Sequence, residues 1–474
     1  MLTRLLLNLL LSALLLGGCA WQTGRVDPTV GELLPRQYLE AAGESAESRP
    51  GRWWLAFNDT VLNRLMERLF VGNLQLEQGF ARLEQSRATL GSLRSSQWPS
   101  LNLDVQGGRA MEPSFAGDST GNSLRLSAAA AYEVDLWGKL ASRTAGGEKG
   151  LEANRDELQS LYLGLSAQLA DLYFLAVEQR AQLALTERSI ESYQDTLQRV
   201  EARYRLGTVP AIDVYQARQS LTAARASRHL SAANLATVEH AISVLLGDYP
   251  KLAETGNLNQ LPPLSESFPT GLPTQLVGHR PDLRAALRRI EAADSEVAAA
   301  IAARFPALNL AAGYGSTRQE FATGLIKGEF WSFLGSLSAP VFDAGRRKAE
   351  VARTRAVVRE RVAAYQLAAL TAFREVEDAL STDRETELRI ASLEETGRAT
   401  AATLRLALDR YLHGVADYLP VLTAQRADFE LQSRLLAARR GLISNRISLA
   451  RALGGDWMSA AMQTRQLLSK DDNS

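Results

Sequence analysis

The side chains best suited to bind a metal ion or to act as nucleophiles are four histidines and one cysteine. The histidines are His229, His240, His279 and His413, and none stands in the His-Glu-x-x-His pattern that places two imidazoles on one metal ion. His229 and His240 lie on one predicted helix, where a shared face or two separate exposed side chains are both open readings. A glycine-rich phosphate loop and a nucleophile elbow are also absent from the sequence. We therefore expect no metal, no soluble cofactor and no enzymatic activity.

The single cysteine, Cys19, follows a segment typical of a secretory signal peptide. Residues 1–18 have a basic start, an apolar run and two glycines before the cysteine. The segment Leu16-Gly17-Gly18-Cys19 resembles the lipobox of bacterial lipoproteins, which implies cleavage before Cys19 and a covalent lipid such as palmitate on that residue. Ala20 follows, where an aspartate would signal retention in the inner membrane, so the resemblance favours the outer membrane. An ordinary signal peptide that ends near a cysteine is the alternative.

Charge and hydropathy exclude two further classes of protein. The chain carries 53 basic and 53 acidic residues, and this balance argues against nucleic acid as a partner. After residue 19, no run of about 18 uninterrupted apolar residues occurs, so a transmembrane helix is not expected. If the mature chain crosses a membrane, it must do so with strands.

The chain repeats itself with a constant offset of 207 residues. Residues 98–103 match 305–310, Gly138 matches Gly345, and the offset does not slip between these landmarks. Residues 73–247 and 280–454 are therefore predicted to be two copies of one structural unit. The predicted segments around them are an N-terminal segment with a first equatorial helix at 19–72, a proline-rich connector at 248–279 and a tail at 455–474.

Each copy is predicted to consist of helix, strand, strand, long helix and helix. Apolar residues at helical spacing predict a helix over 57–95 that Gly72 and Asn73 interrupt. Alternation predicts four strands, at about 99–108, 123–135, 306–315 and 331–342, with loops at 108–122 and 315–330. The remaining helices are predicted at 139–203, 211–246, 346–410 and 418–453, the longest about 100 Å long. Glycine-containing turns at 207–210 and 414–417 join them in pairs.

The four strands indicate an oligomeric membrane barrel. Each has an apolar face and a polar or small face, and aromatic residues stand at strand ends, namely Tyr132, Trp137, Tyr314 and Trp331. Four strands cannot close a barrel, and open strand edges are not tolerated in lipid. Three protomers would supply twelve strands, with the helices forming a second tube into the periplasm. A soluble helical protein with two small hairpins is the alternative.

Five segments carry a resemblance to a known family. They are residues 53–59 (WWLAFND), 132–138 (YEVDLWG), 280–283 (RPDL), 339–347 (APVFDAGRR) and 418–426 (YLPVLTAQR). They resemble the NodT-type branch of the TolC family, the outer-membrane lipoproteins of resistance-nodulation-division (RND) efflux systems. The resemblance implies a homotrimer with a twelve-stranded β-barrel, a long periplasmic α-helical barrel and a tip that opens. The implied partners are a periplasmic membrane-fusion adaptor and an inner-membrane RND pump.

The resemblance also places a periplasmic gate at the two helical turns. The matching positions in the second copy are Arg410, Tyr411, Asp417, Tyr418, Leu419 and Arg426, and those in the first are Arg203, Tyr204 and Asp213. Rings of Leu419 would form an apolar constriction, and Arg426 would tie neighbouring helices through an acidic partner. Related ducts often carry an aspartate three residues before that arginine, where this chain has Thr423. Asp417 as a substitute acid and a looser closed state are the two alternatives. A solvated helix face for Arg410 and Arg426, and ordinary coiled-coil packing for Leu419, are the alternatives.

Strand phase places Asp104 and Glu133 on the polar face, where they would line the lumen. The predicted function is an exit duct that carries small toxic compounds outward from the pump, as in multidrug resistance. Drugs, aromatic acids, solvents and metal ions all remain candidate cargoes. A duct for protein or peptide secretion and a periplasmic coiled-coil scaffold that forms no pore are the competing functions.

Overall fold

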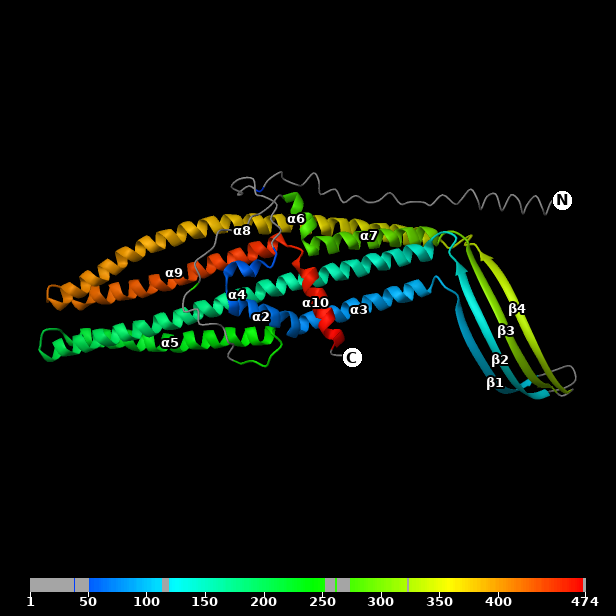
Figure 1. Ribbon diagram of the computed structural model, residues 1–474, viewed down its shortest axis with the longest axis horizontal. Coiled ribbons are helices and arrows are strands. Elements are labelled where there is room, and N and C mark those ends of the chain that lie inside the picture. Colours follow the sequence, from blue (N-terminus) through cyan, green and yellow to red (C-terminus); the bar gives the residue numbers. More distant parts are fainter. Residues whose placement is uncertain are drawn as a thin grey trace. The chain divides into compact units, whose positions relative to one another are not determined.

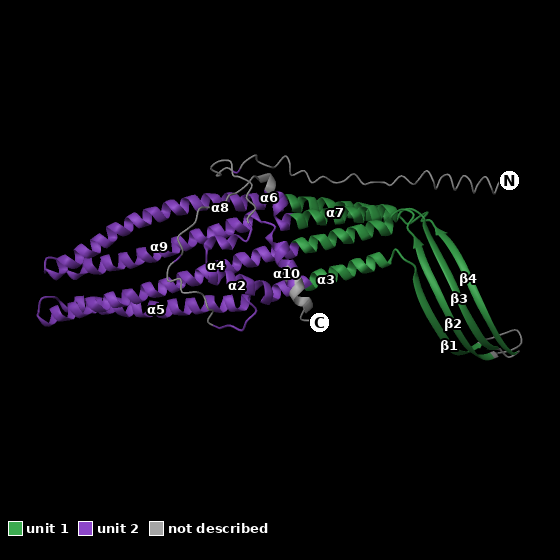
Figure 2. Cartoon of the chain, viewed as in Figure 1, with its two compact units in different colours: residues 1–30, 81–156, 284–367 green, residues 31–80, 157–283, 368–474 purple. Residues whose placement is uncertain are grey.

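The computed structural model describes Tyr38 and residues 51–112, 119–251, 261, 273–321 and 324–471. The predicted signal peptide, Cys19 and most of the connector lie outside the described residues. The chain divides into two compact units (Figure 2). Unit 1 comprises residues 1–30, 81–156 and 284–367, and unit 2 comprises residues 31–80, 157–283 and 368–474.

Unit 1 contains one antiparallel sheet in which the strands lie in chain order (Figure 1). The strands are β1 (Ser100–Glu112), β2 (Ser119–Val134), β3 (Ala307–Phe321) and β4 (Gly324–Ser338). Register places the predicted apolar residues of all four strands on one face, because Leu101 pairs with Ala130, Tyr132 with Leu310 and Tyr314 with Trp331. The polar residues share the opposite face.

The strands are longer than predicted at the hairpin end, so the predicted loops at 108–122 and 315–330 were wrong in extent. The β3–β4 ladder continues to the pairing of Phe321 with Gly324. Beyond Tyr314 and Trp331, the apolar face becomes charged, with Arg318 opposite Lys327. Strand pairing depends on backbone hydrogen bonds and does not require an apolar face. The β3–β4 pairing therefore continues beyond the residues whose apolar and polar side chains alternate. At its other end β4 stops at Ser338 and not at 342, since Pro340 lacks an N–H donor.

The helices that follow the strands agree with the predicted bounds to within two residues. They are α4 (Lys139–Arg205), α5 (Ala211–Leu245), α8 (Arg346–Leu412) and α9 (Tyr418–Leu453). In the described part of the chain, α4 alone contains a stretch long and apolar enough to cross a membrane, and 61% of that stretch is buried. Buried core helices of soluble proteins have the same length and apolar composition, so this stretch does not by itself indicate a membrane helix.

The predicted interruption at Gly72 and Asn73 is confirmed. The α-helices α2 (Thr60–Gly72) and α3 (Leu74–Ser95) occupy the predicted range, and a 3-10 helix, η2 (Trp53–Phe57), precedes them. Asn73 makes the break, because its side-chain oxygen accepts from the backbone N–H groups of Gln75 and Leu76 at 2.9 and 3.0 Å. An asparagine in this position caps the helix that follows it.

Two further helices correct the sequence analysis. The connector ends in α6 (Pro273–His279), because proline is tolerated in the first turn of a helix. The C-terminal tail forms α10 (Trp457–Asp471), whose Trp457 packs edge-on against Trp54 at 4.7 Å between ring centroids. An aromatic contact of this kind stabilises a helix that shows little periodicity of its own.

The internal repeat extends to single hydrogen bonds in unit 2. The helix α7 (Pro281–Ala302) repeats α3, and α8 repeats α4, each pair with the same length and an offset of 207. Asn73 donates to the backbone oxygen of Leu245 at 2.7 Å, and Arg280, its counterpart, donates to that of Ala452 at 3.3 Å. The two copies therefore use different side chains for the same link between helices.

Candidate gate and duct surfaces

The two predicted turns form the ends of two helical hairpins in unit 2, α4–α5 and α8–α9. Gly207 and Gly414 adopt φ angles of 74° and 75°, a left-handed conformation that favours glycine. The N–H of Thr208 donates to Arg203 O at 3.0 Å, and that of Val415 donates to Arg410 O at 2.9 Å. These bonds satisfy helix C-terminal carbonyls, so both turns are closed in the same way.

Arg203 connects the first hairpin to the second. Its Nη1 donates to the backbone oxygen of Tyr411, and its guanidinium lies 4.6 Å from the centre of the Tyr411 ring. A cation above an aromatic face adds electrostatic attraction to the hydrogen bond. The sequence analysis placed Arg203 in the gate region only as the counterpart of Arg410, and did not foresee this contact.

Tyr411 and Tyr418 are core residues of the paired hairpins. They are 2% and 0% exposed, and their ring centroids are 5.8 Å apart. Val200, Ala217 and Val421 pack around them. Burial raises the pKa of Tyr418 to about 12, so its hydroxyl stays protonated. Within the described chain neither phenol has a hydrogen-bond partner.

Asp213 lies close to this core, at the start of α5. Burial raises the pKa of the Asp213 carboxyl, repulsion from Asp417 raises it further, and Arg203 opposes both effects. Asp417 is exposed at the N-cap of α9 and makes no capping hydrogen bond through its side chain. The two hairpins thus bring two carboxylates of like charge near one arginine.

Arg426 does not meet the acidic partner that the sequence analysis expected within this chain. In unit 2 its Nη2 donates to the hydroxyl of Ser220 at 3.2 Å. Thr423 bonds to the backbone oxygen of Leu419 at 2.9 Å, as threonines on helices commonly do.

Gln425, which the sequence analysis missed, is a buried polar residue of this region. Its side-chain nitrogen donates to the hydroxyls of Ser192 and Thr196 at 3.1 and 2.9 Å. It thereby links α9 to α4. The signal in the sequence was a glutamine on the apolar face of a predicted helix.

The remaining predicted gate residues are exposed. Leu419 is 59% exposed, and so is Ile212, its counterpart in the first copy. Tyr204 and Arg410 also face solvent in the single chain. Large apolar side chains that stay exposed together at a tip are typical of a surface that meets another chain.

The polar face of the sheet holds both predicted lumen residues. Register places Asp104 opposite Ser127 and Glu133 opposite Asn309 on that face. Glu133 forms an ion pair with Lys139. The same face carries Arg125, whose guanidinium lies 4.5 Å from the ring centre of Phe330.

The histidines do not form a common site in the described part of the chain. His229 and His240 are exposed on α5, and His413 contacts Asp409 at the tip of α8. Across the described residues, no group of three or more side chains is placed to hold a metal ion.

Comparison with known proteins identifies the family. The family model of the outer membrane efflux protein matches residues 65–248 and 272–455, so the second match begins and ends 207 residues after the first. The chain therefore belongs to the outer membrane efflux protein family. Like the other members, it is an outer-membrane component of an efflux system.

Relatives of known name agree with this assignment. The solvent efflux pump outer membrane protein SrpC of Pseudomonas putida is 32% identical over 416 residues, which cover 85% of this chain and 86% of SrpC. The cation efflux system protein CusC of Escherichia coli is 28% identical over 85% of this chain and 88% of CusC. Among solved structures, the outer-membrane channel OprN superposes with a TM-score of 0.82 at 27% identity, covering 90% of this chain and 97% of OprN.

Proposed function

We propose that three copies of the chain form a passive exit duct of a tripartite RND efflux pump. The observation that carries this proposal is the open sheet of unit 1. Its edge strands β1 and β4 each pair on one side only within the described chain, and its apolar face, including Leu103, Trp331 and Phe333, is exposed. In lipid an apolar face is favourable, but an unpaired edge is not, so further copies must complete the sheet.

The polar face supports three copies and a pore. Two copies would give eight strands, a barrel whose interior side chains can fill. Three copies give twelve strands and a wider interior. The polar face carries mostly glycine, alanine and serine in its membrane part, as at Ala129, Ala311 and Ser336, so such a barrel stays open to water.

The gate is proposed at the tips of the two hairpins. Leu419 and Ile212 face solvent in one chain, and in a trimer they meet their copies to form a narrow apolar ring that excludes water. Arg203 holds the second hairpin against the first, so its loss lets the tip open. The same exposed tip is the proposed contact for a periplasmic membrane-fusion adaptor, which joins the duct to an inner-membrane RND pump.

The cargo is set by the pump in this proposal, and the chain performs no catalysis. The names of relatives support a broad cargo range, as SrpC belongs to a solvent efflux pump and CusC to a cation efflux system. A covalent lipid on Cys19 is part of the proposal. Mass spectrometry of the mature N-terminal peptide tests it, since an acylated Cys19 as first residue is expected, and an unmodified one would refute the anchor.

Single-channel recording in planar bilayers tests the duct. Wild-type protein is expected to give small, mostly closed currents, and Arg203→Ala and Leu419→Ala are expected to enlarge them. The control is Leu388→Ala, because Leu388 on α8 is also 59% exposed but belongs to no tip. Trimer mass is checked by native mass spectrometry. An inserted trimer without current in any variant would refute the gate, and a protein that neither trimerises nor inserts would refute the duct.

A further inference from the structure

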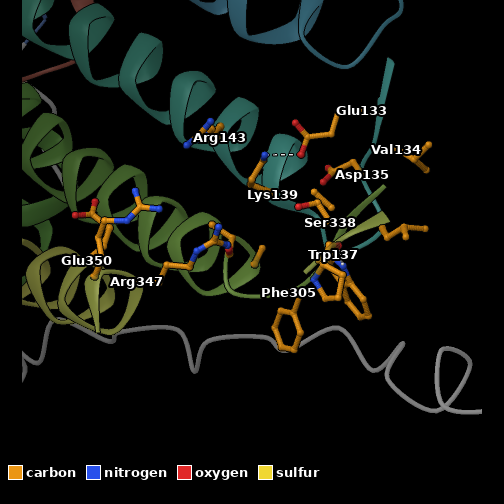
Figure 3. A pocket seen from close by; sticks show the side chains of 16 residues that line it. Glu133, Val134, Asp135, Trp137, Lys139, Arg143, Phe305, Ser338, Arg347 and Glu350 are labelled. Carbon is orange, nitrogen blue, oxygen red and sulfur yellow. Dashed lines mark hydrogen bonds and ion pairs between the residues drawn. The ribbon is translucent and has the colours of Figure 1, made fainter. Parts of the chain in front are cut away.

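Unit 1 contains a cavity of about 530 Å³ where the strands give way to helices (Figure 3). Its walls come from three connections of the chain, β2 to α4, α7 to β3 and β4 to α8. The volume falls within the range of small-molecule sites, which is about 300 to 1,000 Å³. Nothing in the proposed gate uses this cavity.

The charges in the wall leave a positive excess. Three acids line the cavity, and each has a partner: Glu133 pairs with Lys139, Asp135 accepts from the N–H of Ala141 at 2.7 Å, and Glu350 binds Arg353 at 2.6 Å. Against these three acids the wall holds four cations, Lys139, Arg143, Arg346 and Arg347, and of these Arg347 pairs with Asp343 at 3.5 Å.

Two further arginines of the wall, Arg143 and Arg346, make no ion pair or side-chain hydrogen bond within the described chain. An anion is therefore the ligand that the wall favours. Arg143 lies on α4 and Arg346 at the start of α8, so the two arginines line the cavity from different helices.

One wall of the cavity is aromatic and rigid. Trp137 stacks on Phe305 with 4.9 Å between ring centroids and 26° between planes. Trp137 Nε1 donates to Pro306 O at 2.7 Å, which fixes the indole. Aromatic faces contribute large apolar contact at low entropic cost, so the ligand should carry an apolar body beside its charge.

The cavity lies on the polar side of the sheet. Its lining residues Glu133, Ala307 and Ser338 share the face of Asp104 by strand register, since Glu133 pairs with Asn309 and Ala307 with Ser338. In the proposed trimer this side faces the pore. The location on the export path rests on the proposed function, whereas binding to the cavity does not.

We propose that this cavity binds organic anions, carboxylates attached to an aromatic or other apolar body, as they pass through the duct. Arg143 and Arg346 bind the carboxylate, because guanidinium groups hold a carboxylate through paired, charge-assisted hydrogen bonds. Trp137 and Phe305 contact the apolar body. A cluster of three such sites in one trimer would raise the local concentration of anionic cargo at the junction.

Fluorine NMR on the full-length protein in detergent tests the site with 4-fluorobenzoate as probe. Wild-type protein should broaden the probe signal saturably beyond the effect of empty micelles. The double change Arg143→Gln with Arg346→Gln should weaken binding about tenfold or more, and each single change should weaken it less. The double change to lysine, which keeps the charge, should restore part of the binding. Arg359→Gln is the matched control, because Arg359 is an exposed arginine of α8 outside the cavity wall.

Two further probes, one without the charge and one without the aromatic ring, separate the contributions of the arginines and of the aromatic wall. Uncharged 4-fluorobenzyl alcohol should bind weakly if charge matters, and fluoroacetate should bind weakly if the aromatic wall matters. Equal binding by wild type and the double glutamine variant, or by the acid and the alcohol, would overturn the proposal. Size-exclusion chromatography confirms that each variant is assembled. A protein that binds the probe but neither trimerises nor inserts into a membrane would refute the duct and leave the anion site standing.

Discussion

Individual residues decide how closely the strands of unit 1 approach. Gly315 on β3 faces the ring of Phe330 on β4, which in turn lies under the guanidinium of Arg125 on β2. A Cβ atom at Gly315 would lie 2.5 Å from the backbone oxygen of Leu126 and 2.7 Å from the Phe330 ring. The ring can lie flat across β3 only because residue 315 has no side chain.

Gly315→Ala is expected to destabilise the sheet by about 1 to 3 kcal/mol, the usual range for overpacking. The backbone oxygen of Leu126 cannot rotate away, so β2 or β3 must shift. Thermal unfolding of the trimer, followed by heat-dependent mobility on gels, measures the effect. Gly328→Ala on β4 is the control, because a Cβ there would meet nothing within 4 Å. Equal unfolding temperatures for the two variants would contradict the packing argument.

A second residue-scale prediction concerns Asp213. Its pKa is raised by burial and by repulsion from Asp417, so the packed tip holds a proton more tightly than an opened tip does. The stabilisation is complete below the ordinary carboxyl pKa of about 3.9 and is lost as pH rises through the raised value. Acidification should therefore favour the closed tip.

Open probability in planar bilayers should fall as pH is lowered from neutral through the raised pKa of Asp213, and Asp213→Asn should reduce this dependence. Asp378→Asn, at an exposed position of α8, controls for a lost charge elsewhere. His413 lies at the same tip, 3.4 Å from Asp409, so His413→Gln is needed as a second control. An unchanged pH profile in the Asp213 variant would show that another group responds.

At the scale of elements, the repeat is held together by close approach of backbones in unit 2. Gly247 at the end of α5 lies against Gly72 at the end of α2, where an added Cβ would be 2.2 Å from Gly72 O. In the second copy, Gly454 lies against His279, and a Cβ there would be 2.8 Å from His279 O. Both glycines have positive φ angles, 83° and 78°. Side chains differ between the copies, but the approach of the helix ends does not.

Gly454→Ala should cost about 1 to 3 kcal/mol, since it combines an unfavourable φ angle with a backbone clash. Gly441→Ala in the interior of α9 should instead stabilise by about 0.5 to 1 kcal/mol, because a Cβ there meets nothing within 4 Å and alanine favours helix. Chemical denaturation followed by circular dichroism distinguishes the two. A neutral result at Gly454 would mean that α6 and α9 can separate at no cost.

At the scale of the whole molecule, the two faces of the sheet meet different solvents in the proposed trimer. Val105 lies on the apolar face and its neighbour Gln106 on the polar face, and both are exposed in the single chain. A lysine on the lipid-facing side of a barrel, near the midplane of the bilayer, destabilises the barrel by about 2 to 4 kcal/mol. Each of the three copies would bear that cost. A lysine in an aqueous lumen costs little.

Val105→Lys is therefore expected to reduce the amount of trimer inserted in the outer membrane, whereas Gln106→Lys should insert as wild type does. Membrane fractionation followed by urea extraction measures insertion. Equal insertion of both variants would mean that the apolar face does not contact lipid. Reduced insertion of Gln106→Lys alone would reverse the assignment of the two faces.

The family, the repeat and most helix bounds could be predicted from the sequence because they depend on local signals. Helical periodicity, glycines at the turns and alternation along strands are each written in a few consecutive residues, as at Gly207, Gly414 and the strand that contains Leu101 and Leu103. The ends of β3 and β4 were missed because hydrogen bonding continued after alternation had ceased. The helix α10 was missed because its packing partner, Trp54, lies about 400 residues away in the sequence.

The contacts of the candidate sites were decided by tertiary structure alone. Nothing near Arg203 in the sequence indicates that it reaches Tyr411, and nothing near Arg426 indicates a serine partner in place of an acid. The cavity between the strands and helices of unit 1 is likewise lined by residues from three separate connections of the chain. Sequence determined which side chains and which elements exist, because those follow from local chemistry. Folding decided which side chains meet, because distances between remote residues depend on how the elements pack.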